Sequence, residues 1–100
     1  MTRKCLSYRL SVSAINDIRS FKSFLKKQNE EMAINILYTR IQKAILFLRE
    51  FSELGKYDQK INARVFPVQK TRFSIIFRVE KNILEILRIF HTSQRWDKDV

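Results

Sequence analysis

Residues 63–96, ARVFPVQKTRFSIIFRVEKNILEILRIFHTSQRW, decide the fold of this chain. Near the middle of this stretch the side chains alternate with a period of two, which is typical of a β-strand with two different faces. One face carries Phe73, Ile75, Phe77 and Val79, and the other carries Arg72, Ser74, Ile76 and Arg78. A short polar turn at residues 80–82 then leads into residues 83–90, a β-branched and apolar run that is too short for a helix. The stretch therefore predicts a β-hairpin that ends at His91.

The residues before this hairpin predict one more strand and then a helix. Apolar and polar side chains alternate over residues 6–12, which favours a half-buried strand. Ser13 then stands where a helix N-cap belongs, and Asp17 is expected in the first turn. Apolar side chains follow at helical spacing through residues 15–25. Asn29, followed by two glutamates, predicts the cap of a second helix after a short link.

The second predicted helix carries a long apolar stripe over residues 32–51 and is expected to stop at Gly55. Residues 55–59 are expected to form a loop, and residues 61–66 a strand that Pro67 terminates. The predicted class is α+β in the order β-α-α-β-β-β, with a helical hairpin packed on one face of a mainly antiparallel sheet. The other face is left to solvent or a partner. The predicted core consists of Ile15, Ile18, Phe21, Ile36, Ile41, Ile45, Leu48, Phe73, Ile75 and Phe77.

Length and composition indicate a single domain over residues 1–100, with 45% hydrophobic residues, one glycine and one proline. No apolar run approaches the roughly 18 residues that a membrane span needs, and the N-terminus lacks the apolar core of a signal peptide. The single cysteine, Cys5, agrees with a reducing compartment. We therefore expect a cytoplasmic protein that does not enter membranes.

The basic charge is the strongest compositional signal. The chain has 20 Lys and Arg against 10 Asp and Glu, a net charge of +10, which favours an anionic partner. Nucleic acid and an acidic protein both fit this description, and composition does not separate them. The longest basic stretch without an acid contains Lys60, Arg64, Lys70, Arg72 and Arg78.

Most enzyme templates are missing from the sequence. It has no glycine-rich phosphate loop, and one histidine with one cysteine predicts no metal site and no cofactor. The chemistry that remains is cleavage of RNA by its own 2′-hydroxyl, which needs a base and several cations. The residues for that reaction would be His91, Arg64, Arg72 and Arg78.

The C-terminal motifs resemble a known family. ARVFP at residues 63–67, RFSIIFR at 72–78, EILRIFH at 85–91 and the RW pair at 95–96 follow one another as in the ParE branch of the RelE/ParE toxin superfamily. The resemblance implies the same β-α-α-β-β-β fold. It also implies the toxin of a type II toxin–antitoxin system, which a small acidic ParD-like antitoxin binds in a hetero-oligomer.

The resemblance leaves two activities open. In the ParE branch the toxin is a non-enzymatic inhibitor of DNA gyrase, which makes His91 an end-of-strand residue and not a general base. In the RelE branch the toxin is a ribosome-dependent mRNA endonuclease, with His91, Arg64, Arg72 and Arg78 as catalytic residues. The first activity is favoured, and for it the predicted target-binding residues are Arg64, Arg72, Arg78, Arg88, His91, Arg95 and Trp96.

Overall fold

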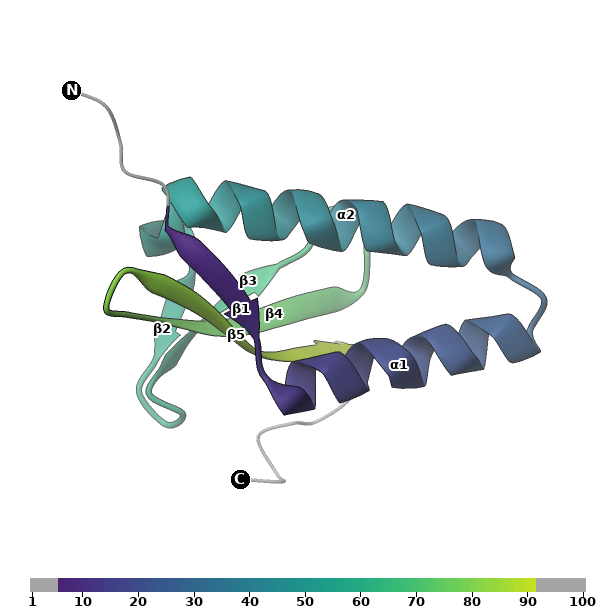
Figure 1. Ribbon diagram of the computed structural model, residues 1–100, viewed down its shortest axis with the longest axis horizontal. Helices are drawn as coiled ribbons and strands as arrows, with labels where there is room; N and C mark the ends of the chain where they lie inside the picture. Colours follow the sequence, from purple (N-terminus) through teal and green to yellow (C-terminus); the bar gives the residue numbers. More distant parts are fainter. Residues whose placement is uncertain (1–5, 92–100) are drawn as a thin grey trace.

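The computed structural model describes residues 6–91, which form a two-helix hairpin and a five-stranded sheet (Figure 1). The sheet order is β1-β5-β4-β3-β2, with β1 parallel to β5 and the other pairs antiparallel. This arrangement confirms the predicted α+β fold. In chain order the elements are β1 Ser7–Leu10, α1 Val12–Lys27, α2 Glu31–Glu50, a 3-10 helix Ser52–Leu54, β2 Lys56–Asp58, β3 Ala63–Pro67, β4 Phe73–Glu80 and β5 Ile83–His91.

The sheet contains one strand more than the sequence predicted. Residues 56–58, which were expected to lie in a loop, form β2 and pair with β3, with Lys56 opposite Val65 and Asp58 opposite Ala63. The strand is short, polar and at the edge of the sheet, so it carries no alternating apolar pattern. β3 also begins later than predicted, at Ala63.

The first helix begins earlier than predicted, because Ser11 and not Ser13 is its N-cap. The Ser11 hydroxyl accepts a hydrogen bond from Ala14 N at 3.0 Å and donates one to Leu87 O at 2.7 Å. The Ser11 amide also donates to Ile86 O at 2.9 Å. The same residue therefore starts α1 and holds it to β5.

The turn between the helices differs from the prediction as well. Asn29 has a φ of 58° and its amide donates to Lys26 O, so it closes α1 in the left-handed conformation that asparagine tolerates. Glu30 is the N-cap of α2 and makes no side-chain cap bond. At its other end α2 stops at Glu50. The chain then makes the 3-10 turn Ser52–Leu54 before it reaches Gly55, where the helix was predicted to stop.

The β4–β5 hairpin contains a β-bulge. Ile76 lies opposite Arg88, whereas the next β4 residue, Phe77, lies opposite Ile86, so β5 carries the extra residue Leu87. The extra residue changes the phase of the alternation on β5. As a result Leu84, Ile86 and Ile89 are all buried in the main core.

The main core lies between the helices and the sheet and corrects part of the predicted list. Phe77 is fully buried, which confirms the faces predicted for the centre of β4, but Val79 at its end is 40% exposed. Ile15 and Ile36 are 36% and 48% exposed, so their assignment to the core is wrong. Ile18, Phe21 and Phe73 lie half-buried at the margin. The buried cluster consists of Ala14, Leu37, Ile41, Ala44, Ile45, Leu48, Val68, Ile75, Phe77, Leu84, Ile86 and Ile89.

The opposite side of the sheet is less polar than predicted. Ala63, Ile76 and Phe90 form a second buried cluster, against which Ile61, Val65 and Leu87 pack.

Within residues 6–91, neither helix combines the length and the apolar character that crossing a bilayer requires.

Candidate functional site

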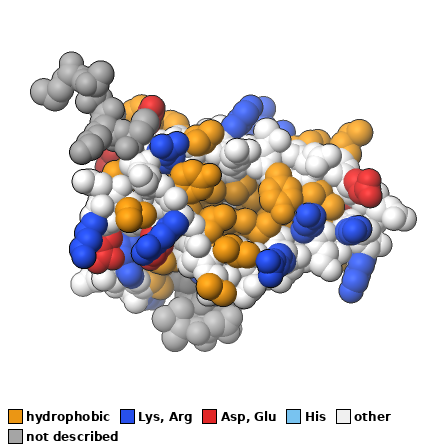
Figure 2. Space-filling model, viewed as in Figure 1, with side chains coloured by type: hydrophobic (Ala, Val, Ile, Leu, Met, Phe, Trp, Pro, Cys, Tyr) orange, Lys and Arg blue, Asp and Glu red, His pale blue; other side chains and the backbone are white. Residues whose placement is uncertain are grey.

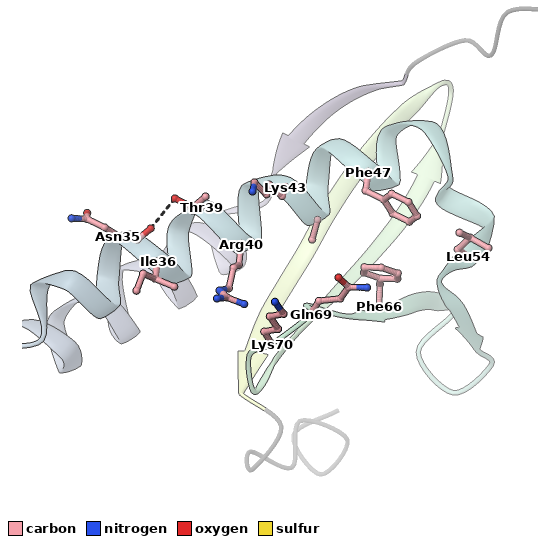
Figure 3. A pocket seen from close by; sticks show the side chains of 11 residues that line it. Asn35, Ile36, Thr39, Arg40, Lys43, Phe47, Leu54, Phe66, Gln69 and Lys70 are labelled. Carbon is pink, nitrogen blue, oxygen red and sulfur yellow. Dashed lines mark hydrogen bonds between the residues drawn. The ribbon is translucent and has the colours of Figure 1, made fainter.

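A groove runs along one side of α2, opposite the connection between β3 and β4 (Figure 3). It encloses about 890 Å³, and its side chains come from α2, the 3-10 turn, β3 and the β3–β4 loop. The lining residues are Asn35, Ile36, Thr39, Arg40, Lys43, Ala44, Phe47, Leu54, Phe66, Gln69 and Lys70.

One end of this groove is apolar and partly open to solvent. The Phe47 ring from α2 stacks on the Phe66 ring from β3, with centroids 5.8 Å apart and planes 27° apart. Phe47 is 40% exposed and Leu54 is 57% exposed. Large apolar side chains that remain exposed and adjacent are typical of a surface that binds another molecule.

A second hollow of about 350 Å³ continues the groove towards the start of β4 and the end of β5. Ile36, Arg40 and Lys70 line both hollows. The remaining residues around the second one are Leu25, Ala33, Leu37, Thr71, Arg72, Phe73 and His91.

Hydrogen bonds within the β3–β4 loop hold Lys70 and Arg72 beside this second hollow. The Thr71 hydroxyl donates to Val68 O at 2.9 Å and accepts from Phe73 N at 3.0 Å, while Val68 N donates to Phe73 O at 2.9 Å. Lys70 has a φ of 60°, a left-handed conformation that completes the tight turn. The two cations are therefore carried on a defined turn.

His91 is positioned by an aromatic contact. Its ring meets Phe73 edge to face, with centroids 5.2 Å apart and planes 89° apart. Phe73 in turn packs against Phe21 of α1 at 4.9 Å. The imidazole therefore lies where α1, β4 and β5 meet, on the side of the sheet that carries the helices.

The charge around the two hollows has one sign. Arg40, Lys43, Lys70 and Arg72 line them together with His91, and among the described residues no Asp or Glu does so. Figure 2 shares the view of Figure 1 and draws the other face, with β1 in front, where hydrophobic side chains also gather in the middle with Lys and Arg around them. In the two hollows the cations lie beside apolar side chains such as Phe47, Phe66 and Phe73. An apolar floor with cationic edges suits a partner that is both anionic and amphipathic.

Three of the predicted target-binding arginines make structural contacts elsewhere. Arg64 donates from Nη1 to Gly55 O at 2.7 Å, and so holds the start of β2. Arg78 donates from Nε and Nη2 to Asn62 O at 3.2 and 3.1 Å. Arg88 donates from Nε and Nη2 to the two carboxylate oxygens of Asp17 at 2.8 and 3.0 Å.

The structure therefore brings together only part of the predicted set. Arg72 and His91 line one hollow. Arg64, in contrast, lies opposite Phe77 on β4. Phe77 is four residues along the strand from Phe73, which contacts His91, and this separation corresponds to about 13 Å. Arg78 follows Phe77 on β4 and points to the opposite face of the sheet. The predicted residues Arg95 and Trp96 lie outside the described part of the chain.

Sequence reasoning missed the α2 side of the groove. Arg40, Lys43 and Phe47 were not among the predicted site residues, because they lie within a stretch that reads as one continuous apolar stripe. The available signal was the width of that stripe, since Met32 and Ile36 make it wider than the one face of a helix that a core can bury. Met32 is 78% exposed and Ile36 is 48% exposed.

Comparison with known proteins identifies the family. The fold is similar to that of a solved structure described as the chromosomal ParDE TA system from P. aeruginosa, with a TM-score of 0.75, 18% sequence identity, and coverage of 87% of this chain and 96% of that one. No curated protein matches the chain. The family model described as "ParE toxin of type II toxin-antitoxin system, parDE" matches residues 8–96. Because this match spans most of the sequence, the chain belongs to the ParE toxin family of type II toxin–antitoxin systems.

Proposed function

We propose that this toxin arrests growth by binding DNA gyrase in the cytoplasm, that it catalyses no reaction of its own, and that a small acidic ParD-like antitoxin neutralises it in a hetero-oligomer. The proposal that the toxin catalyses no reaction rests on one observation, the positions of the arginines. Arg64 and Arg78 donate to backbone carbonyls, and Arg88 pairs with Asp17, so these three side chains are engaged in contacts within the fold. RNA cleavage needs cations, a base and an acid around one phosphate.

The antitoxin part rests on charge and on the groove. The net charge of +10 attracts an acidic partner at long range, and the groove offers apolar contacts at short range. For the target, we propose that Arg72, His91 and the segment after Phe90, with Arg95 and Trp96, contribute contacts to gyrase. Arg and Trp are the residues that most often contribute strongly to protein interfaces.

A second function has one observation in its favour. Arg72 and His91 line the same hollow, next to Arg40 and Lys70, so a histidine and three cations do surround one space. A ribosome-dependent mRNA endonuclease would use His91 as the base there and the cations to stabilise the phosphorane.

The two functions are separated by testing the purified protein on both targets. We expect it to inhibit DNA supercoiling by gyrase and to accumulate cleaved DNA, and to leave mRNA on ribosomes intact. His91→Ala should reduce growth inhibition only mildly, whereas ending the chain after Phe90 should abolish gyrase inhibition and keep part of the antitoxin binding. If His91→Ala abolishes growth inhibition and primer extension maps ribosome-dependent cuts in mRNA, the endonuclease is the correct function.

A further inference from the structure

The face of the sheet that points away from the helices carries the second apolar cluster, which we call the far-face cluster. It consists of Ala63, Ile76 and Phe90, which are buried, and of Ile61, Val65 and Leu87, which pack against them. Ser74 lies on the same side of β4 as Ile76 and is only 6% exposed. An antiparallel sheet face that meets water usually carries polar side chains. The composition of this face is therefore that of a covered surface.

The helices do not provide that cover in the described part of the chain. The residues of α1 and α2 that join an apolar cluster join the main core, and the far-face cluster contains none of them. Ile76 and Phe90 are nevertheless only 5% and 6% exposed, as low as Leu37 of α2 in the main core at 8%. Something other than a helix is needed to keep water from this face.

The chain leaves the sheet at the edge of the far-face cluster. Phe90, the second-to-last residue of β5, lies opposite Ser74, and two positions along β4 Ile76 lies opposite Val65. At about 4.8 Å between strands and about 3.4 Å per residue, the Cα atoms of Phe90 and Val65 are about 12 Å apart. Trp96 is six positions after Phe90, and six residues span up to about 20 Å when extended. Trp96 can therefore reach Val65 with length left for a turn.

We propose that residues 92–96 turn back over the far-face cluster and that the Trp96 ring lies on Ile76 and Val65. A tryptophan side chain removes about 150–250 Å² from water when it is buried, which is enough to cover both of these side chains. Neighbouring side chains of an extended segment point in opposite directions, so Arg95 faces solvent. The indole is the anchor of this segment, and the guanidinium beside it stays accessible.

This arrangement has a consequence for the proposed target. The segment that we propose to contact gyrase is held on the sheet face opposite the groove, where Trp96 fixes its position and Arg95 is presented to the partner. Only this consequence rests on the proposed function. The packing of Trp96 on the sheet is independent of which target the toxin binds.

A segment of the same chain fits the far-face cluster better than a second molecule does. The segment begins beside Phe90, so the loop that it closes is short and its effective concentration at the cluster is high. A second copy of the chain would bring another net charge of +10 to the same surface, and like charges oppose that association.

The test uses the fluorescence of Trp96, which is the only tryptophan in the chain. In the purified full-length protein we expect its emission to be blue-shifted relative to the urea-unfolded chain. Acrylamide should quench it at least about threefold less efficiently than in urea, because the ring is packed against apolar side chains. NMR spectra of the methyl-labelled protein should show NOEs from the indole protons to Ile76 and Val65, and none to Leu54 in the groove.

Two variants form a matched pair for the quenching measurement. Val65→Ala shortens a half-buried side chain under the proposed position of the ring, so quenching of Trp96 should become at least about twofold more efficient. Leu54→Ala removes an exposed apolar side chain from the groove and should leave the quenching unchanged. Circular dichroism verifies that both variants are folded.

Three results would overturn the inference. The first is equal quenching of Trp96 in the folded and the urea-unfolded chain. The second is a set of NOEs from Trp96 to Leu54 or Phe47, which would place the ring in the groove. The third is a set of NOEs to Val65 found only between differently labelled copies in a mixed sample, which would assign the far face to a second copy. None of these measurements involves gyrase, so a protein that shows the expected NOEs but does not inhibit gyrase would contradict the proposed function alone.

Discussion

Asp17 shows how one side chain joins the helices to the sheet. Its carboxylate accepts a hydrogen bond from the Ile89 amide at 3.0 Å, next to the β-bulge, and two from Arg88. Asp17→Ala leaves the partly buried amide without this acceptor, so we expect it to lower the free energy of unfolding by about 1–3 kcal/mol. Urea denaturation followed by circular dichroism measures this change.

Arg88→Gln is the control for the Asp17 prediction. The Arg88 side chain is 46% exposed, so solvent screens its ion pair with Asp17, and its loss should cost less than about 1 kcal/mol. The Ile89 amide keeps its acceptor in this variant. Equal losses for the two substitutions would show that the ion pair, and not the amide bond, carries the effect.

Gly55 is required by a close contact and not by its backbone conformation. Its φ is −71°, which any residue adopts, but a Cβ at this position would lie 2.4 Å from Phe77 Cζ and 2.6 Å from Phe77 Cε1. Because the Phe77 ring is fully buried, we expect Gly55→Ala to destabilise the protein by about 1–3 kcal/mol.

A double-mutant cycle checks the Gly55 prediction. In a Phe77→Leu background the added methyl group meets a smaller side chain, so the cost of Gly55→Ala should fall by at least about 0.5 kcal/mol. An unchanged cost in that background would mean that the strain arises from another neighbour, such as Arg64 Cβ at 3.1 Å.

At the scale of elements, β4 is the strand on which the core is built. Phe77 and Ile75 are fully buried between the sheet and the helices. We expect Phe77→Ala to lower the free energy of unfolding by about 3–5 kcal/mol, because it leaves a large cavity. Thermal and urea unfolding measure this loss.

Val79→Ala is the matched control on the same strand. Val79 was predicted on the same face as Phe77 but is 40% exposed, so its truncation should cost less than about 1 kcal/mol. A cost for Val79→Ala close to that of Phe77→Ala would contradict the burial pattern of β4.

The second helix has two apolar faces with different roles. One face buries Leu37, Ile41 and Leu48 in the core, while the other presents Ile36 and Phe47 to the groove. The sequence merges these faces into a single stripe, because residues at adjacent positions lie about 100° apart around a helix. The packing of α2 against α1, β4 and β5 determines which part of the stripe is buried.

At the scale of the whole molecule, the net charge of +10 should control how quickly the proposed acidic antitoxin binds. We expect the association rate constant to fall at least tenfold between about 0.05 M and about 0.5 M salt, because screening shortens the reach of the charges. The dissociation rate should change less, because we propose that apolar contacts in the groove hold the bound antitoxin and salt does not screen such contacts. Stopped-flow fluorescence measures both, and a salt-independent association rate would contradict electrostatic steering.

The sequence by itself determined the fold class, the order of the two helices and of four of the strands, the burial of Phe77, and the family. Each of these follows from local information: periodicity of two or 3.6, turn residues, and motifs quoted within short stretches. Ser13 and Asn29 were misassigned as caps because several polar residues near a helix start satisfy the same local pattern.

Only the tertiary structure decided the pairing of β2, the bulge at Leu87, and the separation of Arg64 and Arg78 from His91. It also decided that Arg40 of α2 and Lys70 of the β3–β4 loop line one groove. These features depend on contacts between residues far apart in the sequence. No local pattern shows which of several arginines will donate hydrogen bonds to backbone carbonyls in the folded protein. The arginine motifs therefore identified the family, while the fold determined which cations remain beside the groove.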